Sequence, residues 1–327
     1  MTNKLPASSV STTGSDSGTF SATLSGLAPG TSYVFRAYAV VSGTGQYSAE
    51  QGTFQAGSPM VFKTQGATKP AVDKDWLELG SGKDGSQYVA STTYAGSERN
   101  YTVFYDTFMM TPLWTAYPLE RGHMGSYKRP SSWSYNPNIN EKYQIKVTGG
   151  IYSGNTYSRG HMCPNGSRNG NTTMQEQTFY VTNQVPQIQN SFNSGIWSSL
   201  EGAVQGVAKS MNEEIYVVTG VAFNKGAESP TINYTSPRDA SSQRVPIPNY
   251  FYKLVLRVKT SGGTVTDAVC VAFWFEHKAY SDSYANYTVS VDEVEAWTGF
   301  DFFVNLPSEI EARCEAENTT WSAFTSF

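Results

Sequence analysis

The sequence predicts an α+β protein in which a central antiparallel sheet is flanked by helices. Three apolar runs, 215–223, 250–258 and 265–275, are rich in β-branched residues and separated by turn residues, which is typical of strands. A helix ahead of them is indicated by an apolar row with helical spacing, formed by Phe192, Ile196, Leu200, Val204 and Val207. Together these patterns predict a sheet with at least one helix packed on it.

Length and charge limit the classes of function. At 327 residues the chain exceeds the usual single-domain size of about 100–150 residues, so one large domain and an accessory piece fit within it. It carries 23 basic and 27 acidic residues, a net charge of −4, so a nucleic-acid enzyme of this composition needs a local positive cleft. No apolar run reaches the roughly 18 residues of a membrane helix. At most one disulfide can form from the three cysteines, Cys163, Cys270 and Cys314.

Residues 1–65 are rich in Ser, Thr and Gly and alternate apolar with polar positions, as half-buried strands do. The turn at 27–33 and the following segments 36–39 and 45–47 resemble the later half of a fibronectin type III module. A complete module needs about seven strands and roughly 100 residues. We therefore expect the early strands to be missing and Met1 to lie inside a longer natural protein.

A polar segment, 66–74, contains Pro70 and is typical of a hinge between domains. The second domain proper is expected to begin at Trp76, directly after this hinge. The sequence therefore divides into a partial fibronectin-like segment, 1–65, and a second domain, 66–327.

Further elements of the second domain follow from local patterns. Residues 99–119 alternate and are rich in aromatic side chains, which predicts paired strands. The segment 126–140 contains two prolines and several turn residues, so we expect a loop there. Ser-x-x-Glu at 290–293 and at 308–311 matches the capping box, which predicts two short helices near the end of the chain.

The segment between residues 157 and 201 groups most of the residue types that could carry chemistry. In chain order it contains Arg-Gly-His at 159–161, Thr-Asn-x-x-Pro-Gln at 182–187, and Asn193, Trp197 and Glu201 at helical spacing. This order resembles the DNA/RNA non-specific endonuclease family, the endonuclease G-like branch of the ββα-metal (His-Me finger) nucleases. The resemblance extends over roughly residues 70–315 through further segments at 76–79, 99–101, 114–119, 245–252 and 298–303.

The resemblance implies a ββα-metal fold and hydrolysis of phosphodiester bonds in both DNA and RNA. It implies that His161 is the general base and that Asn193 is the direct protein ligand of a Mg²⁺ ion, which Mn²⁺ can replace. It further implies that Glu201 holds metal-bound water and that Arg159 and Arg129 lie near the scissile phosphate.

These residue types suit the chemistry independently of the resemblance. A neutral imidazole, with an ordinary pKa of about 6.5, can deprotonate water at neutral pH. Mg²⁺ keeps several of its waters, so one protein oxygen and a substrate phosphate are enough to hold it. Because Asn193 and Glu201 would lie about 12 Å apart along a helix, we expect only one of them to be a direct ligand.

Some assignments have rivals in the sequence. His123 lies in a second Arg-Gly-His-Met, but no comparable motifs follow it, and His277 at the end of a strand is expected to be solvent-exposed. Asn190 competes with Asn193, because one extra residue precedes this part of the helix relative to the commonest family spacing. Ser158 stands where the family usually has Asp, so a hydrogen bond is retained while a charge is lost.

Charged residues outside the motif are assigned to substrate binding or to no function. Lys128 and Arg168 are expected to contact the nucleic-acid backbone.

In the non-functional alternative, Asn193 caps the first turn of the helix, Glu201 is a solvated helix residue and Arg129 is an ordinary surface arginine.

Two other classes of function remain open from the sequence. One is a nuclease-fold or adhesion-type protein that binds nucleic acid without cutting it. The other is a phosphodiesterase acting on smaller substrates. Retention of His161, Asn193, Glu201 and Arg159 together favours cutting, since a scaffold without activity has no chemical need for all four.

The sequence also predicts a localisation. A fibronectin-like segment joined by a hinge to a nuclease is typical of exported bacterial proteins, and a non-specific nuclease in its own cytoplasm would attack the genome. We therefore expect a secreted, periplasmic or cell-surface protein whose export signal precedes Met1. A cytosolic location would instead call for a dedicated inhibitor protein.

Overall fold

The computed structural model describes residues 76–327, except residues 84, 150 and 212, together with the backbone of four short strands between residues 32 and 55. The chain divides into two compact units, residues 1–58 and 59–327.

The N-terminal unit contains two antiparallel strand pairs: β1 (Ser32–Phe35) with β4 (Gly52–Gln55), and β2 (Tyr38–Val41) with β3 (Thr44–Tyr47). Most of residues 1–65 and the whole predicted hinge, 66–74, lie outside the described residues. The fibronectin type III resemblance and the boundary between residues 65 and 66 therefore stay predictions.

The second unit is built on a seven-stranded, fully antiparallel sheet of order β15-β14-β13-β10-β7-β6-β5. Its strands are β5 (Tyr88–Ala95), β6 (Glu98–Asp106), β7 (Thr111–Leu119), β10 (Ile215–Ala222), β13 (Tyr250–Ser261), β14 (Thr264–Glu276) and β15 (Thr288–Val289). Every strand expected from an apolar or alternating run in this unit is present. The predicted α+β class with a central antiparallel sheet is thus confirmed.

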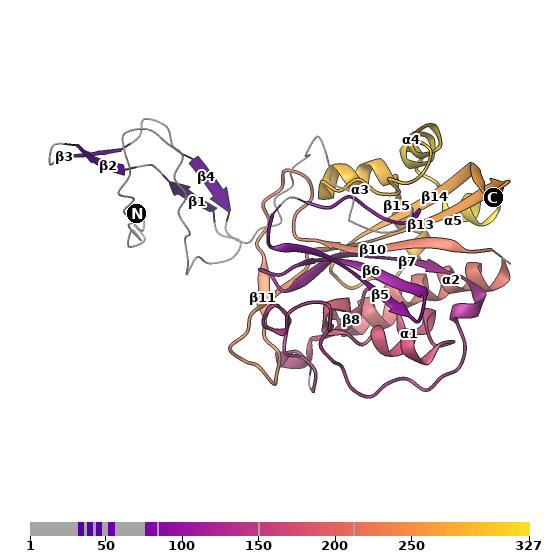
Figure 1. The fold of residues 1–327 in the computed structure, drawn as a ribbon, viewed down its shortest axis with the longest axis horizontal. Helices are drawn as coiled ribbons and strands as arrows, with labels where there is room; N and C mark the ends of the chain where they lie inside the picture. Colours follow the sequence, from indigo (N-terminus) through magenta and orange to yellow (C-terminus); the bar gives the residue numbers. More distant parts are fainter. Residues whose placement is uncertain are drawn as a thin grey trace. The chain divides into compact units, whose positions relative to one another are not determined.

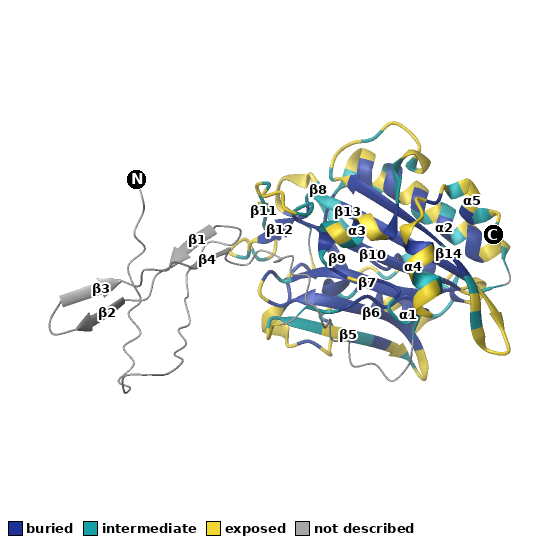
Figure 2. Cartoon of the chain, turned by 90° about the horizontal axis from the view of Figure 1, so that it is seen from above, coloured by how far each residue is buried: buried dark blue, intermediate teal, exposed yellow. Residues whose placement is uncertain are grey.

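The central strands are buried along most of their length, as their uninterrupted apolar runs indicate. In β10, Val217 and Val218 are fully buried, and Val218 lies opposite Leu254 on one side and Ala116 on the other. Figure 2 shows buried residues along the middle strands and exposed residues on the outer loops.

Two layers of helices and short strands cover the two faces of the sheet (Figure 1). One layer contains α3 (Val291–Thr298), α4 (Ser308–Ala316) and α5 (Trp321–Thr325), all of which pack on β14. The other contains α1 (Thr172–Gln177), α2 (Ser198–Ser210), β8 (Tyr157–His161) and β9 (Gln184–Ile188).

Alternation along β13 assigns its side chains to the two layers. The Phe251 ring lies 5.5 Å from that of Trp197, just before α2, whereas the neighbouring Tyr252 ring lies 5.7 Å from that of Phe302, beyond α3. The next residue, Lys253, therefore points towards the α2 layer.

The predicted helix from Phe192 is shorter than expected. All five residues of its apolar row are buried, so the assignment of its inner face is confirmed. The regular helix, however, starts only at Ser198. The preceding segment η6 (Gln189–Trp197) is interrupted by Ser191, with a φ of 68°, and by Gly195, with a φ of −117° and a ψ of −115°.

Of the two capping boxes predicted near the end of the chain, only the first is formed. Ser290 and Glu293 form the expected capping box at α3, each side chain bonded to the other residue's backbone N–H. The second predicted box is absent, because α4 begins at Ser308 itself and follows Pro307 without a side-chain cap. A third helix, α5, has no counterpart in the prediction.

The remaining elements are short. They are the β11–β12 pair (Asn233–Thr235 and Val245–Ile247) and the single-turn helices η1 (Arg121–His123), η2 (Glu141–Tyr143), η3 (Ser153–Asn155), η4 (Asn165–Ser167), η5 (Val181–Asn183) and η7 (Tyr284–Tyr287). The cysteines Cys163, Cys270 and Cys314 are free and buried. None of the described helices combines the length and apolar character of a bilayer span.

Candidate active site

The predicted Arg-Gly-His motif lies on β8, which forms a two-stranded antiparallel sheet with β9. Gly160 lies opposite Val185, and His161 lies opposite Gln184. A side chain at position 160 has no room, because an added Cβ would lie 2.6 Å from the Cβ of Gln187. Glycine therefore lets β8 lie directly on this buried side chain, and the contact fixes the backbone beside His161.

His161 is half-buried between two aromatic rings. The centroid of its ring lies 4.7 Å from that of Trp133 and 5.0 Å from that of Phe179. Its Nε2 atom is buried and has no hydrogen-bond partner among the described residues. Nδ1 is therefore the nitrogen available to the cleft that His161 lines.

The electrostatic surroundings keep this imidazole neutral. Burial is the largest cause and the guanidinium groups of Arg129 and Arg159 add to it, so the pKa of His161 falls to about 3. A base must be neutral before it accepts a proton, and His161 meets this condition throughout the physiological range. A bound phosphate would offset the two positive charges and so raise the basicity of the ring.

Arg159 and Arg129 approach the cleft from different segments. The Nη1 atom of Arg159 donates to the carbonyl oxygens of Val147 and Thr148, at 3.1 and 3.4 Å. The Arg129 guanidinium lies 5.0 Å from the centre of the Phe179 ring. Both arginines line the cleft, as predicted, and their remaining N–H groups can bind phosphate oxygens.

The Thr-Asn pair after β8 supports the backbone that carries His161. The Oδ1 atom of Asn183 accepts the backbone N–H of Cys163, and its Nδ2 atom donates to the carbonyl oxygens of Cys163 and Thr178, each at 2.9 Å. Asn183 is fully buried. Its role is to hold the chain two residues beyond the histidine, not to contact substrate.

Asn193 presents an oxygen to the same cleft. Its Nδ2 atom donates to Ser158 Oγ at 2.8 Å and to Gln189 Oε1 at 3.1 Å, while Ser158 donates to the carbonyl oxygen of Gln187 at 3.3 Å. With both amide hydrogens engaged, Oδ1 is the atom that remains to accept a cation. Ser158, the residue that departs from the family pattern, thus orients the predicted metal ligand.

Glu201 lines the cleft and lies near a buried lysine. Burial raises the pKa of Glu201 to about 7, and the nearby ammonium group of Lys253 acts in the opposite direction. Lys253 is only 1% exposed; it donates to Thr219 Oγ1 and lies 4.7 Å from the centre of the Trp197 ring. Burial lowers the pKa of Lys253 to about 8, which Glu201 partly counteracts.

These side chains converge on one cleft of about 280 Å³. Its lining comprises Arg129, Arg159, His161, Pro164, Asn165, Gly166, Asn193, Ser198, Glu201, Gly202 and Gln205. A Mg²⁺ ion fits this donor set, since the hydrogen bonds donated by Nδ2 of Asn193 leave its Oδ1 atom to accept a cation, and the Glu201 carboxyl group lines the same cleft. The predicted non-functional alternative, with Asn193 as a cap, disagrees with these contacts.

The assignment of Arg168 to substrate binding is wrong. Its side chain is completely buried. Nε donates to Asn100 Oδ1 at 2.6 Å, and the two terminal nitrogens donate to the carbonyl oxygens of Ser167, Asn100 and Pro118. A guanidinium enclosed in this way ties the loop after β8 to β6 and β7 and cannot reach a nucleic-acid backbone.

The other basic residues near the motif differ in their surroundings. Lys128 is exposed but does not line the cleft, so its backbone contact stays a prediction. Arg121, though close in sequence, donates from Nε to the carbonyl oxygen of Lys209 at 2.9 Å, near the end of α2. A cation at this end of a helix is favourable for the exposed carbonyl groups.

The remaining two histidines are structural. The Nδ1 atom of His123 accepts the Glu120 N–H at 3.2 Å, and its Nε2 atom lies 3.0 Å from Glu98 Oε1. His277 is half-buried, which corrects the expectation of solvent exposure. It accepts the Ile188 N–H at Nε2, and its Nδ1 atom lies 2.8 Å from the Pro248 carbonyl oxygen, so it joins the end of β9 to the sheet.

The structure also distinguishes the two candidate asparagines. Asn190 is exposed, has an extended backbone and does not line the cleft, whereas Asn193 does. The position predicted by the helical spacing with Trp197 and Glu201 is therefore the one that reaches the site.

Comparison with known proteins places this geometry in a family. The profile of the DNA/RNA non-specific endonucleases matches residues 82–309, which is most of the chain. The chain belongs to this family. As a DNA/RNA non-specific endonuclease family member it is a nuclease, and its predicted resemblance is confirmed.

Individual relatives extend the comparison. This endonuclease is 26% identical over 229 residues to a nuclease of Nostoc sp., a match that spans 68% of this chain and 78% of the relative. It is 31% identical over 159 residues to nuclease C1 of Cunninghamella echinulata, over 47% of this chain and 60% of that protein. In the crystal structure of the EndoG/EndoGI complex, one chain aligns with a TM-score of 0.56 at 18% identity, over 69% of this chain and 91% of its own length. That likeness confirms the fold.

Two residues beside the candidate cleft were not identified from the sequence. Lys253 and Arg257 are the two charged residues within the apolar run 250–258, and a charge inside such a run is the available signal for Lys253. Trp133 lies in the predicted loop 126–140, where nothing in the local pattern distinguishes a ring packed on His161 from an ordinary loop aromatic.

Proposed function

We propose that this chain is a Mg²⁺-dependent endonuclease that hydrolyses DNA and RNA without selecting the sugar, and that Mn²⁺ can replace Mg²⁺. One observation carries the proposal: His161, Asn193, Glu201, Arg159 and Arg129 line a single cleft, although they come from separate segments of the chain. No base-reading element is needed for this activity, because the cleft offers groups suited to phosphate and metal.

His161 acts as the general base. Its Nδ1 atom takes a proton from a water molecule, and the resulting hydroxide attacks the phosphorus opposite the departing 3′ oxygen. The enclosing rings of Trp133 and Phe179 restrict the imidazole to one orientation. The positioned base thereby avoids the entropy cost of a freely moving one.

The two arginines stabilise the charge that accumulates on the phosphate. Arg159 is anchored by two carbonyl oxygens and Arg129 by an aromatic ring, so each presents its remaining donors with limited freedom. Such preorganised donors contribute more in the transition state than in the ground state.

Asn193 would hold the metal ion through Oδ1, and Glu201 would accept hydrogen bonds from its waters. When bound, the ion neutralises charge on the phosphate and on the leaving oxygen. Ser158 keeps the Asn193 oxygen turned to the cleft through the hydrogen bond to Nδ2.

A cleavage assay tests the proposal. Supercoiled plasmid, single-stranded DNA and a long RNA are each incubated with the chain in Mg²⁺, in Mn²⁺ and in excess EDTA. We expect all three polymers to be degraded with either ion and none in EDTA. Binding without cleavage, or hydrolysis restricted to a dinucleotide or model diester, would support the alternative classes instead.

We propose that this enzyme is exported from the cytoplasm. An indiscriminate nuclease is harmful beside its own genome, and the fibronectin-like segment suits an extracellular protein. Fractionation of cells that express the full-length gene product is expected to recover the enzyme outside the cytoplasm. Recovery in the cytosol would contradict export and would lead us to search the same fraction for an inhibitor protein that copurifies with it.

A further inference from the structure

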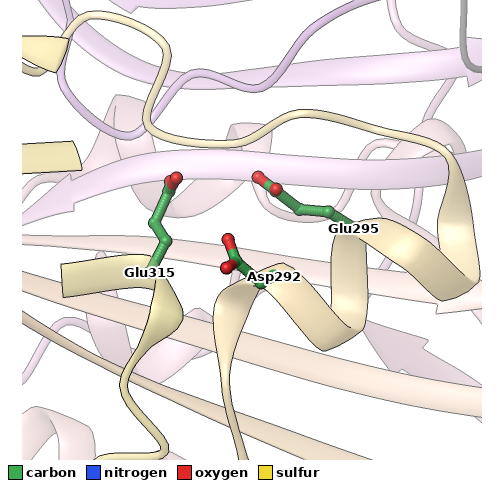
Figure 3. A group of neighbouring side chains, drawn as sticks. All are labelled: Asp292, Glu295 and Glu315. Atoms are coloured by element: carbon green, nitrogen blue, oxygen red, sulfur yellow. The ribbon is translucent and has the colours of Figure 1, made fainter. Parts of the chain in front are cut away.

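Three carboxylate groups meet between α3 and α4, away from the proposed active site. Asp292 and Glu295 lie on α3, and Glu315 lies on α4. One oxygen from each lies within 4.8 Å of an oxygen from each of the others. Figure 3 shows that the three side chains turn towards one common point.

Glu315 provides the second observation. Its residue is only 4% exposed, and its Oε1 atom is buried with no hydrogen-bond partner among the described residues. An unpartnered buried carboxylate oxygen costs several kcal/mol if it carries charge. A ligand that binds this atom would remove the penalty.

No cation forms an ion pair with the three carboxylates in the part of the chain that the structure describes. None of the five ion pairs among the described residues includes Asp292, Glu295 or Glu315. Glu295 Oε1 accepts one backbone N–H, from Phe302 at 2.7 Å. Burial, as the larger cause, and neighbouring acidic groups together raise the pKa of Glu315 to about 11 and that of Glu295 to about 8.

We propose that Asp292, Glu295 and Glu315 bind a calcium ion that joins α3 to α4. Ca²⁺ takes six to eight oxygen ligands at about 2.3–2.6 Å, and carboxylates can bind it through one or both oxygens. Ligands on opposite sides of such an ion lie about 5 Å apart, which the observed spacing allows with little movement. Mg²⁺ demands shorter distances and stricter octahedral geometry, so it suits this cluster less well.

The surroundings give the ion access and a structural role. Asp292 is exposed, Glu295 is half-buried and Glu315 is buried, so a solvent path leads to the innermost ligand. The helices α3 and α4 contact each other and β14, on the opposite face of the sheet from α2 and β8 (Figure 1). The calcium site is thus separate from the Asn193 site, and Glu315 lies beyond the residues matched by the family profile.

Thermal unfolding in the absence of catalysis tests the site. The Asn193→Ala chain is used throughout, because it lacks the proposed metal ligand of the cleft. After EDTA treatment and dialysis, CaCl₂ is added at pH 8, and we expect the unfolding midpoint to rise by at least about 4 °C at saturation, as ligand binding to the native state requires. A midpoint that does not respond to CaCl₂ would show that the three groups share protons instead, and would overturn the proposal.

Two substitutions in the same chain locate the effect. Glu315→Gln keeps the shape of the side chain but removes its charge, so we expect the calcium response to fall to less than a quarter, even if the variant is more stable without calcium. Glu309→Gln changes an exposed carboxylate on the same helix and should leave the response intact. Equal responses in the two variants would place calcium elsewhere and contradict the assignment.

Discussion

At the scale of single residues, the two Arg-Gly-His sequences show how context changes one side chain. His161 lines the cleft with one nitrogen available, whereas both nitrogens of His123 are engaged by Glu120 and Glu98. The same three-residue sequence therefore places one histidine at the candidate cleft and makes the other a structural cross-link. Their different consequences can be measured.

The His161→Ala variant is expected to lose activity by about a hundredfold to ten-thousandfold, with an almost unchanged unfolding midpoint, because it removes a positioned base. His123→Ala should show the converse: a lower midpoint and a kcat within about threefold of the parent at a temperature where both are folded. Plasmid cleavage rates and thermal unfolding of the two variants provide the measurement. An inactive His123→Ala and an active His161→Ala would contradict the location of the site.

Ser158 gives a second prediction, because it fixes the orientation of the Asn193 amide. Ser158→Ala should raise the Mg²⁺ concentration for half-maximal activity by about 10–100-fold, the usual effect of losing a partner of a metal ligand. Activity is measured as a function of Mg²⁺, with Ser199→Ala, an exposed change on α2, as the control. An unchanged Mg²⁺ requirement would show that Asn193 is oriented without Ser158.

Lys253 predicts a pH dependence. Glu201, with a pKa raised to about 7, is expected to set the acid limb of activity, since the pKa of His161 is far lower. Removing the ammonium group in Lys253→Met removes a charge that favours ionised Glu201, so the limb should move to higher pH by roughly one unit. The pH–rate profile is compared with that of Lys259→Met, an exposed change on the same strand. Identical profiles would exclude an electrostatic role for Lys253.

At the scale of elements, the sheet was predictable and the helix start was not. Strands such as β10 and β13 are buried on both faces, so their composition alone identifies them. The apolar row from Phe192 also gave the correct inner face. Its first turns are irregular because Ser191 and Gly195 adopt non-helical backbone angles, and a periodicity of apolar residues does not register such angles.

Membership of the candidate cleft was predictable for residues that share a local motif, and the prediction failed for a residue whose surroundings are decided by tertiary packing. His161, Arg159, Asn193 and Glu201 follow from the motif and its spacing. Arg168 has the same charge and lies close in sequence, yet its carbonyl partners on β6 and β7 become neighbours only on folding. No local pattern distinguishes such a buried arginine from an exposed one.

The β8–β9 pair provides a prediction for a whole element. Gly160→Ala would place a methyl group against the Cβ of Gln187 and separate the strands, at a cost of roughly 1–3 kcal/mol of unfolding free energy, and should reduce activity at least tenfold because His161 moves with β8. Denaturant unfolding and cleavage rates are measured together.

The matched control is Gly206→Ala in α2, where an added Cβ has nothing within 4 Å. Alanine is the better helix former, so this variant should gain about 0.5–1 kcal/mol with unchanged activity. If Gly160→Ala were as stable and as active as Gly206→Ala, the close approach of the two strands would not be needed.

At the scale of the whole molecule, the basic residues at the cleft have the opposite sign to the net charge of the chain. The chain has a net charge of −4, yet Arg129 and Arg159 line the cleft and exposed Lys128 adjoins Arg129 in sequence. Attraction of nucleic acid is therefore local and should be weakened by salt in proportion to the few phosphates bound. A protein with basic residues spread over its surface would show a steeper dependence.

The salt dependence of KM tests this distribution and the unproven contact of Lys128. Each phosphate contact contributes about 0.9 to the slope of log KM against log salt for duplex DNA at fixed Mg²⁺. Lys128→Ala should therefore reduce the slope by about one, because it removes one backbone contact. Arg121→Ala removes an equal charge from a residue bound to the end of α2 and should leave the slope unchanged. Equal slopes for the parent and Lys128→Ala would show that Lys128 does not contact a phosphate and that the arginines make these contacts. Equal reductions of the slope in Lys128→Ala and Arg121→Ala would instead indicate long-range attraction by total charge.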